Sequence, residues 1–407
     1  MTTPKILDTD IFANADPGLT FDSVSQTFTT TTGVLVSSSQ NDGVFGRGDS
    51  EALFNNGGVL GGSDGVELFG GNSLVSNAAN AIIVGVNDGV SVGGNIAEVD
   101  NQGSITGFTQ NGVEFGGDSN HTTLNNTGSI SGRSNGVLET SVFDGGMIHN
   151  SGLIGSDHDG IEVFTATGLT TVIDNAAGGT IRGGNDAVQV TRGGIALDNH
   201  GKVIGGIDIG FDSEGADTIV NHGTIVGEVF LGDGNDVFVG TGGTSGSVFG
   251  DNGNDRLTGG SATDKLHGGD GDDRLIGVGG NDTLDGGSGF DTLTGGPGKD
   301  QFVFQSRLAP GPDLDRITDF AVNVDKIVLD EDVFHGIGHA GVLSTGLFHV
   351  GAAAHDANDH IIYNPSSGFL IYDANGNRPG GDVHFATLAP HLALTHADFL
   401  VTEILVA

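Results

Sequence analysis

A nine-residue period runs through residues 231–303 and constrains the fold more than any other feature of the sequence. Segments such as GGDGDDRLI, GVGGNDTLD and GGSGFDTLT follow the pattern G-G-x-G-x-D-x-U-x, where U is apolar. Glycine permits turns with positive φ, and the last three places predict a short strand whose middle residue enters a core. The sixth place holds an aspartate at Asp236, Asp255, Asp264, Asp273, Asp282, Asp291 and Asp300.

Carboxylates packed into adjacent turns repel one another, and this segment has too few Lys and Arg residues to balance them. Calcium resolves the conflict, because it is a hard cation that takes about six to eight oxygen ligands. The alternative to a folded calcium-binding segment is a disordered acidic linker. A linker, however, would not keep Leu, Ile or Phe at the eighth place of the nonapeptides. We therefore expect several Ca²⁺ ions in this segment. The predicted metal-site residues are Gly232, Asp233, Gly234, Asp236, Asn252, Gly253, Asp255, Asp264, Gly269, Asp270, Gly271, Asp273, Gly280, Asp282, Gly287, Gly289, Asp291 and Asp300.

A longer repeat of 22 to 25 residues precedes it, from Thr31 to about Gly227. Each copy reads Asn-x-Gly, a β-branched residue, a Gly turn, then Asn/Asp-Gly-Val and another short apolar strand. This pattern predicts one coil of a parallel β-helix per repeat. Stacked Asn side chains at equivalent corners should form a hydrogen-bonded ladder. Copies start at Asn55, Asn77, Asn101, Asn126, Asn150, Asn175, Asn199 and Asn221.

The composition excludes several classes of function. The 407-residue chain carries 52 Asp and Glu against 14 Lys and Arg, a formal net charge of −38. This balance disfavours nucleic acids and anionic membranes as partners and favours cations. Cysteine is absent, so disulfides and thiolate zinc sites cannot hold the fold. We expect no N-terminal secretory signal, because no basic stretch precedes an apolar one, and no membrane span.

The nonapeptides resemble those of the RTX family of calcium-binding secreted proteins. The resemblance implies that two nonapeptides make one turn of a β-roll and that ions lie between repeats n and n+2. Two features depart from the family pattern: Ala262 replaces a fourth-place glycine, and the repeat at Gly240 lacks its Asp. Carried over to this chain, the ions should bridge Asp255 with Asp273, Asp264 with Asp282, Asp273 with Asp291, and Asp282 with Asp300.

The last hundred residues lose the glycine period and contain a predicted hairpin, with apolar strands around Pro365 to Gly368. They resemble the region after the repeats in serralysin-type RTX proteins, which caps the roll and carries a C-terminal type I secretion signal. The implied partner is the type I secretion machinery, and the implied location is extracellular. The expected domains are an N-terminal cap (1–30), a β-helix (31–228), a β-roll (229–303) and a cap with the secretion signal (304–407).

Three further stretches contain residue types that occur in metal or catalytic sites. HGIGH, at residues 335–339, has the spacing of two zinc-binding histidines but lacks the Glu base, and its glycines disfavour a helix. DANGNR, at residues 373–378, resembles the start of an EF-hand loop but is interpreted as a turn. The third stretch comprises Asp157, His158 and Asp159, which could supply acid and base groups for proton abstraction beside a uronate carboxylate. Alginate epimerases, which combine a right-handed β-helix with RTX modules, have an Asp-Pro-His cluster. HDG occupies the corner slot that NDG fills in other coils, so a turn is favoured.

The sequence thus predicts an all-β protein, with a right-handed parallel β-helix, an RTX parallel β-roll and a small β-rich C-terminal cap. The leading hypothesis is a secreted calcium-binding protein with a structural or surface-interaction role, whose β-roll folds when Ca²⁺ binds. An extracellular polysaccharide or a cell surface would be its partner. The alternatives are a calcium-dependent polyuronate epimerase or lyase on the β-helix, and an adhesin that assembles edge to edge.

Overall fold

The computed structural model describes residues 5–14, 16–21, 26–116, 119–141, 143, 145–210, 215–306 and 314–403. The chain is nearly all β, and the helices among these residues are two short 3-10 segments, η1 (Thr345–Leu347) and η2 (His396–Asp398). Neither has the length or apolar character needed to cross a bilayer. The predicted all-β class is confirmed. The chain divides into two compact units, Met1–Gly232 and Asp233–Ala407.

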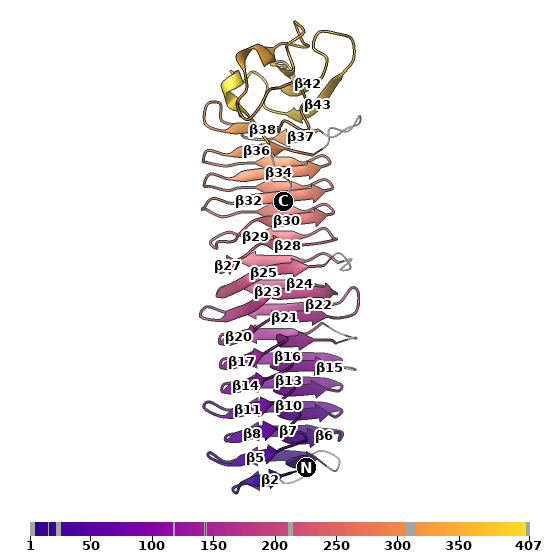
Figure 1. Ribbon diagram of the computed structural model, residues 1–407, viewed down its shortest axis with the longest axis vertical. Coiled ribbons are helices and arrows are strands. Elements are labelled where there is room, and N and C mark those ends of the chain that lie inside the picture. The colour runs from indigo at the N-terminus through magenta and orange to yellow at the C-terminus, as the bar shows by residue number, and fades with distance from the viewer. Residues whose placement is uncertain are drawn as a thin grey trace. The chain divides into compact units, whose positions relative to one another are not determined.

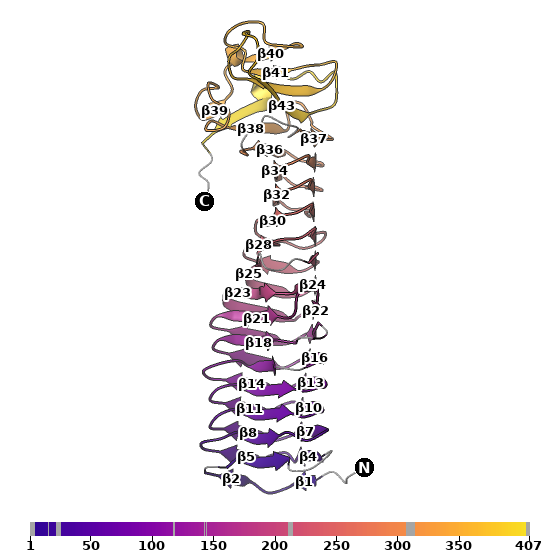
Figure 2. The ribbon, with the colours of Figure 1, turned by 90° about the vertical axis from the view of Figure 1, so that its right-hand side faces the viewer.

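The first unit is a parallel β-helix in which most coils contribute three strands (Figure 1). Figure 2 shows the first ladder on one side of this unit and the second ladder on the other. The first ladder contains β1 (Lys5–Leu7), β4 (Gln26–Thr30), β7 (Glu51–Asn55), β10 (Asn72–Asn77), β13 (Ile96–Asn101), β16 (His121–Asn126), β19 (Met147–Asn150), β22 (Thr170–Asn175), β24 (Gly194–Asn199) and β26 (Thr218–Asn221).

Two further ladders complete the coils, and they merge in the long strands β23 (Thr180–Arg192) and β25 (Lys202–Ile209). The second ladder contains β2 (Ile11–Ala13), β5 (Leu35–Ser38), β8 (Gly58–Gly61), β11 (Ile82–Gly85), β14 (Ser104–Gly107), β17 (Ser129–Gly132), β20 (Leu153–Ser156), β23, β25 and β27 (Thr224–Val226). The third contains β3 (Leu19–Phe21), β6 (Val44–Gly46), β9 (Val66–Phe69), β12 (Val90–Gly93), β15 (Val113–Gly116), β18 (Asn135–Glu139), β21 (Asp159–Phe164), β23, β25 and β28 (Val229–Phe230).

The core of the first unit consists of apolar columns, because the strands stay in register from coil to coil. Side chains alternate between the inside and the outside of each strand, and the inward ones stack on their register partners. Neighbouring coils thereby bury one continuous apolar interior. One fully buried column contains Leu53, Val75, Val99, Leu124, Ile148, Ile173, Leu197 and Ile219.

A ladder of buried asparagines ends the strands of the first ladder and confirms the predicted Asn stack. The Nδ2 of each Asn donates to the Oδ1 of the next, from Asn55 to Asn221, over 2.7–2.9 Å. Most also donate to a carbonyl in the second-ladder strand of the next coil, as Asn126 does to Leu153 of β20 over 3.0 Å. The ladder satisfies polar groups at the corner that would otherwise be buried without partners.

The second unit begins with a parallel β-roll of two ladders, in which register partners are 18 residues apart. The implied two nonapeptides per turn are thus confirmed. One ladder contains β29 (Val237–Val239), β31 (Arg256–Thr258), β33 (Arg274–Ile276), β35 (Thr292–Thr294) and β37 (Asp315–Ile317). The other contains β30 (Val248–Asn252), β32 (Lys265–Asp270), β34 (Thr283–Ser288), β36 (Gln301–Phe304) and β38 (Lys326–Asp330).

The last strands extend both ladders and surround an aromatic cluster. Strand β43 (Asp382–Thr387) pairs with β37, and β44 (Phe399–Thr402) pairs with β38 and with β39 (Gly341–Val342). Strand β40 (Phe348–Val350) pairs with β41 (Ile361–Tyr363), which pairs antiparallel with β42 (Phe369–Asp373) and so confirms the predicted hairpin. Phe334 packs edge-on against Tyr372 and Phe385.

Candidate metal site

The sixth-place aspartates line up in two buried columns along the β-roll. The first aspartate column contains Asp236, Asp255, Asp273 and Asp291, and the second contains Asp264, Asp282 and Asp300. Within each column, Oδ1 of one aspartate accepts the backbone N–H of the aspartate one turn earlier. The distances are 2.7 Å from Asp255 N to Asp273 and 3.0 Å from Asp282 N to Asp300. The register therefore places the predicted bridging pairs on adjacent turns.

The second carboxylate oxygen is what marks these columns as a site. Oδ2 of Asp255, Asp273, Asp282 and Asp300 is buried and has no hydrogen-bond partner among the described residues. A buried carboxylate oxygen without a donor is costly. It is also the ligand that a hard divalent cation prefers.

Glycine at the first place keeps the space beside these oxygens open. A Cβ built on Gly268 would lie 2.2 Å from Oδ2 of Asp273, and one on Gly277 would lie 2.2 Å from Oδ2 of Asp282. No other residue fits there without displacing the carboxylate. The fourth-place Gly271 has φ 138° and would bring a Cβ to 2.0 Å from the carbonyl oxygen of Gly253, so both conformation and close packing require glycine.

The electrostatics of the columns show how unfavourable the bare carboxylates are. Burial, opposed by a backbone hydrogen bond and reinforced by nearby carboxylates, raises the pKa of Asp273 to about 7. The same effects raise the pKa of Asp255 and Asp282 to about 6. A cation beside these groups would favour their ionised form, as opposite charges do.

The repeat at Gly259, which departs from the sequence pattern, also differs from the others in the contacts of its aspartate. Its fourth place is Ala262, and Oδ2 of its aspartate, Asp264, accepts the N–H of Gly260 over 2.7 Å. That oxygen is already engaged, in contrast to the Oδ2 atoms of Asp255, Asp273, Asp282 and Asp300.

The other predicted metal-site residues lie in the turns. Gly253, Gly269, Gly280, Gly287 and Gly289 all have positive φ. Asp270 and Asn252 are exposed, and Nδ2 of Asn252 donates to Oδ1 of Asp233 over 2.6 Å. Gly234 donates its N–H to the Asn252 carbonyl, while Gly232 falls in the first unit. These side chains lie outside the aspartate columns.

Two aspartates that sequence reasoning missed continue the columns beyond the last nonapeptide. Oδ1 of Asp315 accepts the N–H of Asp291 over 3.1 Å, and Oδ1 of Asp325 accepts the N–H of Asp300 over 3.0 Å. Both are buried. The signal was available, because Asp-Arg-Ile and Asp-Lys-Ile repeat the Asp-x-apolar ending of the nonapeptides.

A further acidic feature, the corner column of the first unit, consists of Asp42, Asp64 and Asp88. Oδ1 of Asp64 accepts the N–H of Asp88 over 3.2 Å. Burial first, and neighbouring carboxylates next, raise the pKa of Asp64 and Asp88 to about 6. The nearby Glu67 carboxyl has its pKa raised to about 7 by burial and by Asp42.

Replacing Asp88 by Asn should make the stability of the β-helix less dependent on pH. Because folding raises the pKa of Asp88 to about 6, the stability that its protonated form contributes is fully present below the unfolded pKa of about 4 and is lost as the pH rises to about 6. The variant should therefore melt at a higher temperature than the parent near pH 8 and at about the same temperature near pH 4. Asn111 and Asn135 occupy the position equivalent to Asp88 in the next two coils, so the corner accepts an Asn side chain. Melting curves at fixed free calcium test this, with exposed Asp157→Asn as the charge control. An equal shift at both pH values would contradict it.

The predicted corner turn is present at Asp157 and His158, and Asp159 is the first residue of β21. Asp157 and His158 form an exposed bend between β20 and β21. Oδ1 of Asp159 accepts the N–H of Asp186 over 3.2 Å, which is the bond that the corner column makes in earlier coils. Asp157 and His158 thus form the bend, and Asp159 makes the backbone contact of the corner column.

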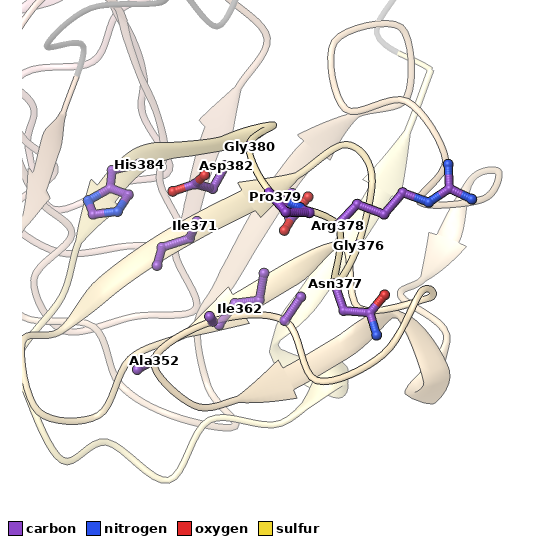
Figure 3. A pocket seen from close by; sticks show the side chains of 13 residues that line it. Ala352, Ile362, Ile371, Gly376, Asn377, Arg378, Pro379, Gly380, Asp382 and His384 are labelled. Atoms are coloured by element: carbon purple, nitrogen blue, oxygen red, sulfur yellow. The ribbon is translucent and has the colours of Figure 1, made fainter.

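The other two stretches also form turns. His335 and His339 lie in a turn outside any helix, and Nδ1 of His339 lies 3.3 Å from Oε1 of Glu331. Residues 374–379 turn back between β42 and β43, with the N–H of Asn375 donating to Oδ1 of Asp373 over 3.0 Å. This loop borders a cavity of about 300 Å³ that Ile362, Ile371 and His384 also line (Figure 3).

Comparison with known proteins identifies the repeat family of the nonapeptides. Residues 249–283 and 276–304 match the RTX calcium-binding nonapeptide repeat. The solution structure of the AlgE6R3 subunit of the Azotobacter vinelandii mannuronan C5-epimerase is similar at 27% identity, covering 36% of this chain and 77% of that one, with a TM-score of 0.27. No curated protein matches the chain. The β-roll of this protein is therefore built from RTX calcium-binding nonapeptide repeats, and the ion that such repeats bind is calcium.

Proposed function

We propose that this chain is a secreted, calcium-stabilised protein with a structural or surface-interaction role, and that calcium binding folds its nonapeptide segment. The observation that carries the proposal is that the buried Oδ2 atoms of four column aspartates have no hydrogen-bond partner among the described residues, namely those of Asp255, Asp273, Asp282 and Asp300. Such an arrangement is unfavourable for the protein alone and favourable around a divalent cation.

The residues that would hold calcium are pairs from adjacent turns. Asp255 with Asp273, and Asp273 with Asp291, would share ions in the first aspartate column. Asp282 with Asp300 would do so in the second, and Asp264 with Asp282 would form a weaker site because Gly260 already occupies one oxygen of Asp264. The ions would supply charge neutralisation, and the turn glycines would bring backbone carbonyls within reach.

The carboxylates of the aspartate columns would also favour export of this protein as an unfolded chain. Where calcium is scarce, repulsion within the columns disfavours the rolled state, which suits passage through a type I secretion system. Calcium modules of extracellular proteins bind with dissociation constants of about 10⁻⁴–10⁻³ M, so the segment would fold after release. The net charge of −38 adds to the repulsion and favours solubility.

The β-helix would supply the structural role. Its Asn ladder and apolar columns hold a long series of coils in register, and its outward positions offer a repeated surface to an extracellular polysaccharide or a cell surface. The contacts of residues 157–159 do not favour epimerase or lyase chemistry there. Asp157 and His158 lie in an exposed bend, and Asp159 is engaged by the backbone of Asp186.

Calcium titration of the full chain tests the proposal. Hydrogen exchange should show residues 249–304 unprotected in EGTA and protected at saturating calcium, with a midpoint of about 10⁻⁴–10⁻³ M. Magnesium at the same concentration is the ion control, since it needs a smaller octahedral site. Equal protection in EGTA and in calcium would show that the roll folds without the ion and would refute the proposal.

A further inference from the structure

A second cluster of metal-ligating side chains lies in the loop between β40 and β41, outside the calcium-binding repeats. One ligand atom each of His355, Asp356 and Asp359 lies within 4.8 Å of the other two. His349, on β40, brings its Nδ1 to 3.7 Å from Oδ2 of Asp359. Its ring stacks on that of His355 with centroids 5.8 Å apart and an interplanar angle of 18°. One imidazole and two carboxylates thus lie close together, and a second imidazole, that of His349, lies beside the Asp359 carboxylate.

The loop is held in this conformation by one of the ligands. Asp359 is only 6% exposed, and its Oδ2 accepts the backbone N–H groups of His355 and Asp356 over 2.7 and 2.9 Å. Oδ1 of Asp356 accepts the N–H of Asn358 over 2.8 Å. These hydrogen bonds fix the positions of the side chains that would bind a metal ion before any ion is present. This lowers the entropic cost of assembling a site.

The loop is also anchored from the outside by Asn377. The N–H of Asn377 donates to the carbonyl of Asp356 over 3.1 Å, and its Nδ2 donates to the carbonyl of His355 over 3.3 Å. Asn377 lines the cavity of Figure 3, which also takes in Ala354, the residue before His355. The cluster therefore contacts β40 through His349 and the turn between β42 and β43 through Asn377.

We propose that His349, His355, Asp356 and Asp359 form a binding site for a first-row divalent ion of the zinc type, distinct from the calcium sites. Imidazole with carboxylate is the donor set of Zn²⁺ and its neighbours, whereas calcium takes oxygen ligands alone. Two carboxylates balance the charge of one such ion. The bound ion would fasten the loop to β40.

The experiment is a Co²⁺ titration of the full chain in excess calcium, which occupies the nonapeptide carboxylates. The parent should develop a saturable visible spectrum that Zn²⁺ abolishes. His349→Ala and His355→Ala should each weaken Co²⁺ binding by more than about tenfold, since even the outer-shell partners of metal ligands change affinity by about 10–100-fold. His339→Ala is the matched control, because His339 also pairs with a carboxylate, that of Glu331.

Loss of binding in the two ligand variants, with His339→Ala unchanged, would support the site. Unchanged binding in either ligand variant, an equal loss in His339→Ala, or no saturable spectrum in the parent would overturn it. His355 is exposed, so its removal should leave the fold intact. Melting curves in calcium without Co²⁺ check this and separate lost ligands from lost structure.

Discussion

Replacing Asp273 by Asn should destabilise the calcium-bound β-roll by about 5 kcal/mol. Asp273 lies between Asp255 and Asp291 in the first aspartate column, so it would contribute to two ions. A ligand at about 100 times its dissociation constant stabilises a fold by about 2.7 kcal/mol per site, and the variant forfeits two sites. Asn can still accept the N–H of Asp255 through Oδ1. The loss of stability therefore measures the contribution of Oδ2 of Asp273 to calcium binding.

The same variant should behave in the opposite way without calcium. Burial and neighbouring carboxylates raise the pKa of Asp273 to about 7, so its ionised form is unfavourable in the fold near pH 8. In EGTA the Asn variant should be no less protected from hydrogen exchange over residues 249–304 than the parent. Urea unfolding in calcium and hydrogen exchange in EGTA measure the two effects. Asp272→Asn is the control, since Asp272 is exposed and Asn254 fills its place one turn earlier. Equal losses in both conditions would assign Asp273 a purely structural role.

The features predictable from the sequence are those that repeat in every turn. The Asn ladder is one example: each coil places one Asn at the same corner, so a spacing of 22 to 25 residues converts directly into stacked side chains. The nonapeptides are another, because a fixed spacing of nine fixes both the strand at places seven to nine and the aspartate before it. The pairing of Asp255 with Asp273 came from the resemblance to RTX repeats, which implies two nonapeptides per turn.

Contacts between segments of unequal spacing could not be predicted in this way. Asp315 and Asp325 continue the columns after intervals of 24 and 25 residues instead of 18, because longer loops intervene between the strands. The cluster around Asp359 depends on β40 pairing with β41 and on the anchoring of its loop by Asn377. Neither the pairing of β40 with β41 nor the contact of Asn377 repeats along the chain, so no sequence period indicates them. The raised pKa values of the corner column depend on burial, which the repeated NDG motif does not specify.

Replacing Asn126 by Ala should destabilise the β-helix by about 3 kcal/mol or more, since each buried polar group left unpaired costs about 1–3 kcal/mol. Asn126 accepts from Nδ2 of Asn101 over 2.8 Å and donates to Oδ1 of Asn150 over 2.8 Å and to the Leu153 carbonyl over 3.0 Å. Its removal interrupts the ladder in the middle of the coils and affects partners on both neighbours.

The adjacent Asn125 supplies the matched control for this prediction. It lies on the outward face of the same strand, partly exposed, and donates to Oδ1 of Asp100 over 2.7 Å. Because Asp100 can bond water instead, Asn125→Ala should change stability by no more than about 0.5 kcal/mol. Hydrogen exchange should show faster opening of the coils next to Asn126 in the ladder variant alone, because each coil depends on its nearest neighbours. Similar losses in both variants would mean that the ladder contributes no more than an ordinary surface hydrogen bond, and the stability of the coils would then rest on their apolar columns.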